Sequence, residues 1–181
     1  MLSYQHSYHA GSLADEHKHS ALSIILSRLG EKPKPLSYME THAGRGLYDL
    51  PAAEARKTGE AARGILRLLE EGRLSETHPY RRAIEMVQAR YGANFYPGSP
   101  LVARTLLRPG DRLHLMELHP QEHAALRRTL RRQDVHIHHR DGYEGVLGIS
   151  PPTPRRGLVL IDPSFEIKTE YEKVVEFVVA L

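Results

Sequence analysis

"LVLIDPSF", residues 158 to 165, is the most informative part of the sequence for the fold. It joins four apolar residues directly to an acid, a proline, a serine and an aromatic ring. A buried parallel strand is a continuous apolar run, because both faces of a parallel sheet are covered. An ionisable side chain at the carboxyl end of such a strand lies where open α/β sheets bind their ligands. The stretch therefore predicts a parallel α/β sheet with a binding site where this strand ends.

Composition places the chain among globular proteins. Its 181 residues are enough for one domain, and no apolar run approaches the roughly 20 residues that span a bilayer. The absence of cysteine excludes disulfides and thiolate metal sites and favours a cytoplasmic location, and the N-terminus lacks the pattern of a signal peptide. The net charge of +3 and pI near 9.2 suit a phosphate-bearing partner, but an ordinary solvated surface accounts for them almost as well.

The order of the predicted elements indicates one domain over 1–181. Strands are expected within 35–46, 112–120, 135–142 and 155–165, and helices at 12–29, 52–70, 80–91, just after 96–100, 121–133 and 168–181. The first helix would bury Leu13, Ala21, Leu22, Ile25, Leu26 and Leu29. Residues 48–95 would form a helical subdomain inserted after the first strand. Alternating strands and helices predict a Rossmann-like parallel sheet.

Each predicted strand ends in an acid: Glu40, Glu117, Asp141 and Asp162 in chain order. Because parallel strands end at the same edge of a sheet, these carboxylates are expected to line one binding site. A carboxylate has two acceptor oxygens, so Glu117 is suited to both ribose hydroxyls of an adenosine ligand. Asp141 and Gly142 would approach its adenine ring. The alternative for Glu117 and Asp141 is a structural cap of a helix or turn.

The turn after the first strand, His42-Ala43-Gly44-Arg45-Gly46, contains two glycines that allow close approach of a ligand to the backbone. It lacks the third glycine of a dinucleotide-binding motif, and the chain has no Walker motif. An adenosine ligand without phosphates points to S-adenosyl-L-methionine.

DPSF resembles the D-P-P-[YF] motif of methyltransferases that act on an exocyclic amino group of a base. Hydrogen bonds from that amino group to Asp162 and to the Pro163 carbonyl would localise its lone pair for attack on the methyl group. Phe165 would stack on the base, and base–aromatic stacking contributes roughly 1–3 kcal/mol. Alternatively, Asp162-Pro163 simply begins a loop, since Asp-Pro is a common start of a turn.

Several further motifs resemble one family over the whole chain. They are MLSYxHSxHAGxxAD with KH at 18–19, THAGxGxY at 41–48, YPGSP at 96–100, LxLxELHP at 113–120 and RRGLxLIDP at 155–163. They are similar to the RlmJ family of 23S ribosomal RNA adenine-N6-methyltransferases. The resemblance implies a Rossmann-like methyltransferase fold with a small inserted helical subdomain.

The resemblance also implies roles for individual residues. Asp162 matches the catalytic acid, with Pro163 and Phe165 in its motif, and Tyr4, with His6 and His9, matches the part that contacts substrate RNA. The implied cofactor-binding residues are His19, His42, Ser99, Glu117, Asp141, Gly142 and Asp162. Lys18 is a further candidate, as a partner for the carboxylate of the methionine moiety.

Two departures from the family leave an alternative open. Ser164 stands where the family has a second proline, and the chain ends before the last strands of the family's sheet, so the C-terminal part of the family domain is expected to be absent. Both features favour a non-catalytic nucleic-acid-binding relative, one with a role in the use of external DNA. The retained Asp162, Glu117 and N-terminal motif favour the enzyme.

Clustered basic residues have two interpretations. Arg127, Arg128, Arg131 and Arg132 are predicted on one helix and Arg81, Arg82 and Arg90 on another, where they would contact RNA phosphates or form an ordinary solvated face. His136 and His138 would share one face of a strand, with His139 on the other. Two ligands on one face make a weak metal site, so no metal is predicted.

Overall fold

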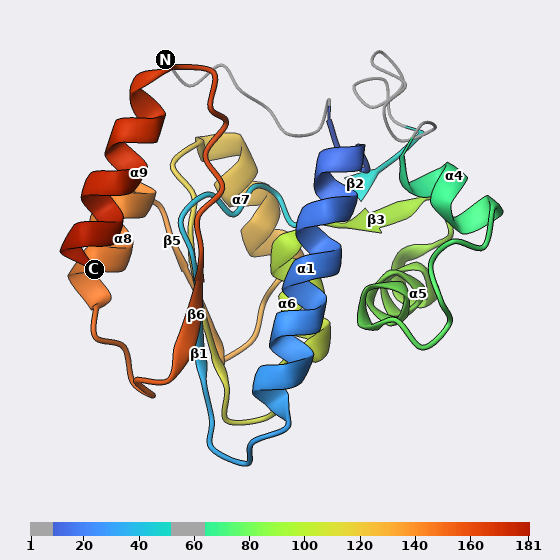
Figure 1. The fold of residues 1–181 in the computed structure, drawn as a ribbon, viewed down its shortest axis with the longest axis horizontal. Coiled ribbons are helices and arrows are strands. Elements are labelled where there is room, and N and C mark those ends of the chain that lie inside the picture. The colour runs from blue at the N-terminus through green and yellow to red at the C-terminus, as the bar shows by residue number, and fades with distance from the viewer. Residues whose placement is uncertain (1–8, 52–63) are drawn as a thin grey trace. The chain divides into compact units, whose positions relative to one another are not determined.

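A computed structural model describes residues 9–51 and 64–181 (Figure 1). The chain divides into two compact units. The first, called the sheet unit, contains Lys34–Gly44 and Arg108–Leu181. The second, called the helical unit, contains the described residues of Gln5–Pro33 and Arg45–Leu107.

The sheet unit is built on four parallel strands, as the sequence predicts. The strands are β1 (Ser37–Glu40), β4 (Arg112–Met116), β5 (Val135–His138) and β6 (Gly157–Leu160), in the order β5-β4-β1-β6. In register, Glu40 of β1 lies beside Leu115 of β4 and Leu160 of β6. The carboxyl ends of β4, β1 and β6 therefore meet at one edge, which is where the predicted site residues follow in sequence.

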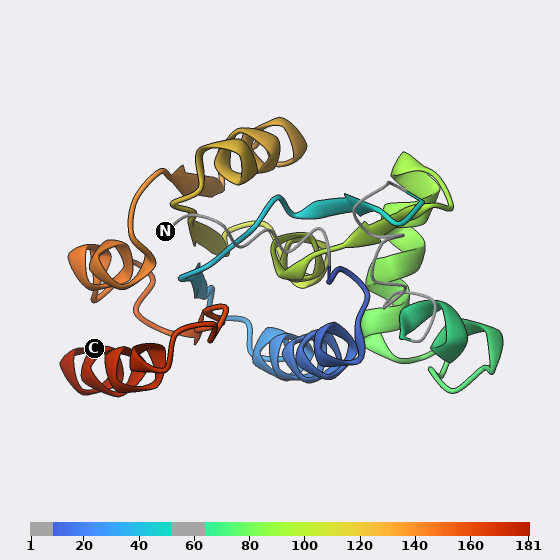
Figure 2. The same cartoon turned by 90° about the horizontal axis from the view of Figure 1, so that it is seen from above.

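Helices cover both faces of this sheet. Helices α8 (Gly142–Ile149) and α9 (Thr169–Ala180) lie side by side on one face, and α7 (Pro120–Thr129) lies on the other (Figure 2). The core beneath α8 and α9 consists of Met39, Met116, Val146 and Phe177. The side chains of β4 alternate between the two faces of the sheet. Met116 belongs to this core, and the buried Leu113 and Leu115 point to the opposite face.

Two features of the sheet unit differ from the sequence prediction. Helix α8 is not predicted, because its glycines disfavour a helix. Gly145 lets the helix pack closely on the sheet, since a Cβ there would lie 2.6 Å from the sulfur of Met116. Helix α7 ends at Thr129 rather than at 133, so Arg131 and Arg132 lie beyond the helix.

The helical unit contains α1 (Leu13–Gly30), α4 (Ile65–Glu70), α5 (Pro79–Tyr91) and α6 (Ser99–Leu106). Strands β2 (Leu47–Asp49) and β3 (Phe95–Pro97) form an antiparallel ribbon in it, which the sequence did not predict. Residues 52–63, the start of one predicted helix, lie outside the described residues. The single domain with an inserted subdomain at 48–95 stays a prediction.

Helix α1 begins where the sequence predicts, with the Ser12 hydroxyl accepting a hydrogen bond from the Asp15 backbone N–H. Its predicted apolar face is largely wrong. Leu22 and Leu26 are buried, but Leu13 and Ile25 are exposed. Polar residues take the other buried positions of this helix, namely Asp15, Glu16, His19 and Ser23. No helix within the described residues is long and apolar enough to cross a membrane.

Candidate active site

The loop that follows β1 remains bonded to both neighbouring strands. The Thr41 backbone N–H donates to the Leu160 carbonyl of β6 at 3.1 Å, and the Ala43 N–H donates to the Met116 carbonyl of β4 at 3.0 Å. Gly44 then turns the chain with a φ of +62°, a conformation that favours glycine. The loop is thus fixed at the middle of the carboxyl edge, and its backbone is open to close approach.

Glu117 follows β4 and is held in place by this loop. One carboxylate oxygen accepts the Gly44 N–H at 2.7 Å, and the other accepts the His119 N–H at 2.7 Å. Burial raises the pKa of Glu117, while these two hydrogen bonds act in the opposite direction. The side chain therefore has the structural role considered as the alternative. Each oxygen nevertheless keeps a second lone pair, so the carboxylate has the capacity to accept two ribose hydroxyls as well.

Asp141 and Gly142 begin α8 directly beside the end of β1. One oxygen of Asp141 caps the helix, accepting the N–H groups of Tyr143 at 2.9 Å and Glu144 at 3.1 Å. A Cβ on Gly142 would lie 2.0 Å from the Thr41 carbonyl oxygen, so only glycine fits at this position. The cap considered for Asp141 is therefore real, and it orients the side chain at the carboxyl edge.

His42 brings the acids of this edge together. Its Nδ1 lies 2.8 Å from the Thr41 hydroxyl, which donates to the Leu160 carbonyl at 3.3 Å. The hydroxyl is left to accept the Nδ1 proton, and Nε2 of the neutral ring is then an acceptor. Burial lowers the pKa of His42, opposed by the negative charges of Glu170, Asp141 and Asp162. The charges of these three carboxylates therefore all act on one ring, and they give the edge a negative potential.

The DPSF segment leaves β6 at the same edge. Asp162 is half-buried and Pro163 is buried, whereas Ser164 is exposed. Phe165 has a φ of +53°, an uncommon conformation for a bulky residue and one that clusters at functional sites. Its ring is 39% exposed and packs on Tyr171, with the ring centroids 4.7 Å apart. The motif thus presents an aromatic face to solvent beside a strand-end carboxylate, even with serine in place of the second proline.

Glu40, the fourth strand-end acid, differs from the others. It is fully buried, and the Tyr38 hydroxyl donates to it at 2.8 Å. Glu40 therefore belongs to the interior of the sheet unit rather than to the open edge.

The remaining predicted site residues belong to the helical unit, where they are described separately. Lys18 donates to Asp15 at 2.9 Å, and Nδ1 of the buried His19 lies 2.9 Å from the Tyr96 hydroxyl. Ser99 is buried at the start of α6. His9 is half-buried, and Tyr4 and His6 lie outside the described residues.

The sequence did not predict three residues that contact the candidate site residues: Tyr143, Glu170 and Tyr96. Tyr143 contacts the His42 ring edge-on and donates to Glu170 at 3.3 Å, although Glu170 is far away in sequence. Tyr96 is an unremarkable aromatic residue until the fold places it against His19. No motif could have revealed these contacts. The residues 9–51 and 64–181 contain no group of three or more His, Asp or Glu side chains that could hold a metal ion.

The sheet unit defines the class of protein: a Rossmann-like α/β fold with carboxylates at the carboxyl edge of its sheet, as in nucleoside-binding domains. A family model described as "Ribosomal RNA large subunit methyltransferase D, RlmJ" matches residues 33–180. The chain therefore belongs to the RlmJ family, which confirms the resemblance and the Rossmann-like methyltransferase fold.

Curated and solved relatives agree with this assignment. Proteins named "Ribosomal RNA large subunit methyltransferase J" from Escherichia coli and Haemophilus influenzae are each 43% identical over 97% of this chain. A crystal structure of a Legionella pneumophila protein matches with a TM-score of 0.83 and 37% identity, over 93% of this chain and 63% of that one. The chain spans 63% and 64% of the lengths of the two curated relatives.

Proposed function

We propose that this chain transfers a methyl group from S-adenosyl-L-methionine to N6 of an adenine in 23S ribosomal RNA, in the cytoplasm. The observation that carries the proposal is the group of carboxylates at the carboxyl edge of the sheet, with Glu117 beyond β4, Asp141 beyond β5 and Asp162 beyond β6. Membership of a family named for ribosomal RNA methyltransferases supports the reaction type.

The residues of the sheet unit fit a sulfonium nucleoside. Glu117 offers one free lone pair on each oxygen to the ribose hydroxyls, and the glycines at 44 and 142 let the backbone come close to the ligand. The carboxylates around His42 supply negative potential for a positively charged group. Neutral His42, with Nε2 as acceptor, adds a polar contact without adding positive charge.

The cofactor, when bound, supplies a methyl group on a positively charged sulfur, which leaves as a neutral thioether. Asp162 and the Pro163 carbonyl would accept the two hydrogens of the adenine amino group and direct its lone pair toward the methyl group. N6 would give up one proton on methylation, and the Asp162 carboxylate would be the first acceptor of that proton. Phe165 would hold the base by stacking, which offsets the cost of taking it out of its own stack.

Lys18, His19 and Ser99 of the helical unit are proposed cofactor-binding residues on the strength of the family motifs alone. Tyr4, His6 and His9 are proposed RNA contacts on the same basis. The ion pair of Lys18 with Asp15 gives that lysine a second role, so its replacement would affect the helical unit as well as the cofactor.

Methyl transfer from labelled cofactor to 23S ribosomal RNA that lacks the modification tests the proposal. The expected product is N6-methyladenosine, detected after nuclease digestion of the RNA. Binding of S-adenosylhomocysteine is measured alongside by calorimetry. A chain that binds RNA but neither binds this nucleoside nor transfers a methyl group would be the non-catalytic relative, and the proposal would be wrong.

A further inference from the structure

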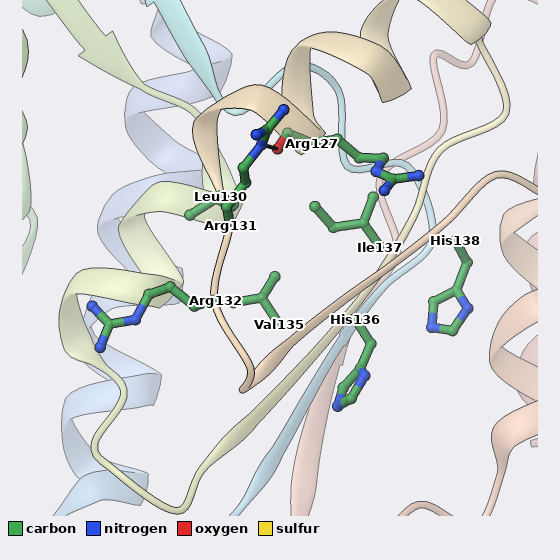
Figure 3. Close-up of a pocket in the computed structure, with 8 residues that line it drawn as sticks. All are labelled: Arg127, Leu130, Arg131, Arg132, Val135, His136, Ile137 and His138. Carbon is green, nitrogen blue, oxygen red and sulfur yellow. Dashed lines mark hydrogen bonds between the residues drawn. The ribbon is translucent and has the colours of Figure 1, made fainter.

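A pocket of about 670 Å³ lies beside the edge strand of the sheet unit, between β5 and the C-terminal end of α7 (Figure 3). Its size falls within the range of ligand pockets, about 300–1,000 Å³. Among the described strands β5 pairs only with β4, so the pocket follows an edge that no other described strand covers. The pocket is distinct from the carboxyl edge, because none of its lining residues belongs to the candidate active site.

The lining is strongly basic. Arg127, Arg131 and Arg132 contribute to it, all three are exposed, and no acid lines it. Arg132 lies 3.6 Å from Asp134, while Arg131 donates to the Arg127 carbonyl at 3.3 Å. Within the described part of the chain, no carboxylate forms an ion pair with Arg127 or Arg131. Their positive charges are therefore directed to solvent or to a partner.

The arginines are spread along the strand rather than gathered at one point. Figure 3 shows the guanidinium groups of Arg127 and Arg131 toward one end of the pocket and that of Arg132 at the other. The apolar side chains of Val135 and Ile137 lie between them, and His136 and His138, which also line the pocket, extend from the other face of the strand. A single oxyanion would be bound by converging donors, whereas separated cations with apolar surface between them suit an extended polyanion.

We propose that this basic groove, formed by Arg127, Arg131, Arg132 and β5, binds the phosphate backbone of the RNA substrate away from the methylation site. Arginine suits this role because its planar fork matches a phosphate group and stays charged at every relevant pH. Val135 and Ile137 would contact the sugars between phosphates. Such contacts position an RNA without reading its sequence. The inference rests on the proposed function, which supplies RNA as the polyanion.

The test uses the full chain with Arg127→Gln and Arg131→Gln combined, because glutamine removes the charge and, at position 127 within α7, keeps a similar helix propensity. The matched control combines Arg28→Gln and Arg67→Gln, which removes the same charge from exposed arginines of the helical unit (77% and 64% exposed). A second variant, Arg127→Lys with Arg131→Lys, keeps the charge. Binding of a labelled RNA hairpin is measured over a series of salt concentrations, with S-adenosylhomocysteine binding as the check on folding.

We expect the glutamine pair to weaken RNA binding roughly 10-fold. The slope of log affinity against log salt concentration should become shallower by about 1.5, because each lost phosphate contact removes roughly 0.7–0.9. The lysine pair should keep most of the slope, and nucleoside binding should be unchanged in every variant. If the glutamine pair had the same RNA affinity and salt slope as the control, the groove would not be an RNA-binding surface. The methyltransferase proposal would remain intact. An acidic polyglutamate peptide that competes as well as RNA would also overturn it, in favour of a protein partner. Groove-dependent RNA binding without nucleoside binding would instead support the groove and refute the proposed enzyme.

Discussion

Two edges of the same sheet carry opposite charge, and they are built in different ways. The carboxyl edge is acidic, and its members Glu117, Asp141 and Asp162 come from separate parts of the chain. The edge along β5 is basic, and its arginines and strand lie within one short segment, residues 127–138. A cationic nucleoside suits the first edge and a polyanion the second. The acidic site therefore depends on the register of the whole sheet, whereas the basic groove needs only one helix and one strand.

Replacing Asp162 should have the largest effect. Asp162→Asn keeps the shape but weakens the acceptor at the target nitrogen, so methyl transfer should fall by roughly 100-fold or more, with a much smaller loss of nucleoside affinity. The control Glu166→Gln removes the same charge from an exposed position in the same loop. Single-turnover methylation rates measure the effect. Equal rates for the two variants would remove Asp162 from the chemistry.

Gly142 tests whether the acidic edge depends on close contact of α8 with β1. Gly142→Ala places a Cβ against the Thr41 carbonyl oxygen and should lower the free energy of unfolding by about 3 kcal/mol. In the same helix, Gly148→Ala meets no atom closer than 3.7 Å and should raise that free energy by about 0.5–1 kcal/mol. Urea unfolding of both variants gives the comparison. Similar stabilities would mean that the contact is not tight.

Glu117 tests the nucleoside contact itself. Glu117→Gln should weaken S-adenosylhomocysteine binding by roughly 10-fold, because a charged acceptor is lost from hydrogen bonds that contribute about 1.5–3 kcal/mol. Burial raises the pKa of Glu117, so the affinity of the parent protein should fall as the pH is lowered, and the variant should lose that dependence. Calorimetry from pH 5 to pH 8 measures both. The exposed Glu144→Gln is the control, and parallel pH profiles for parent and Glu117→Gln would speak against the assignment.

His114 gives the smallest expected effect. It lies on β4, and its ring stacks on that of His136 of the neighbouring strand β5. Burial, with His136, His138 and Arg112 nearby, lowers its pKa from 6.5 to about 4. In the unfolded chain His114 therefore takes up a proton near pH 6.5. In the folded chain it does so only near pH 4. The contribution of neutral His114 to the free energy of unfolding is therefore fully present above pH 6.5. It is lost as the pH falls from 6.5 to 4.

His114→Gln should make the free energy of unfolding less dependent on pH in that window, by about 1 kcal/mol once solvent screening of this partly buried ring is allowed for. Replacement of the exposed His17 should leave the dependence unchanged. Urea titrations at pH 5 and pH 7.5 provide the data. A variant as sensitive to acid as the parent would show that His114 is not responsible.

The strands were predictable because an apolar run ending in an acid has few other interpretations, and β6 from Gly157 to Leu160 lies inside the predicted stretch. The edge location of Asp162 follows from the same pattern. Helix α8 was missed because Gly142, Gly145 and Gly148 oppose a helix locally, and packing against Thr41 and Met116 overrides that preference. Contacts such as Tyr143 with Glu170 could not be predicted, since they join elements only through the folded sheet.

A crystal structure of this chain with S-adenosylhomocysteine bound would show directly whether the strand-end carboxylates form one nucleoside site. We predict the ribose hydroxyls of the nucleoside within hydrogen-bonding distance of Glu117, and its sulfur on the side of the same cavity that Asp162 faces. A nucleoside bound away from Glu117, or Glu117 and Asp162 facing separate cavities, would contradict the account.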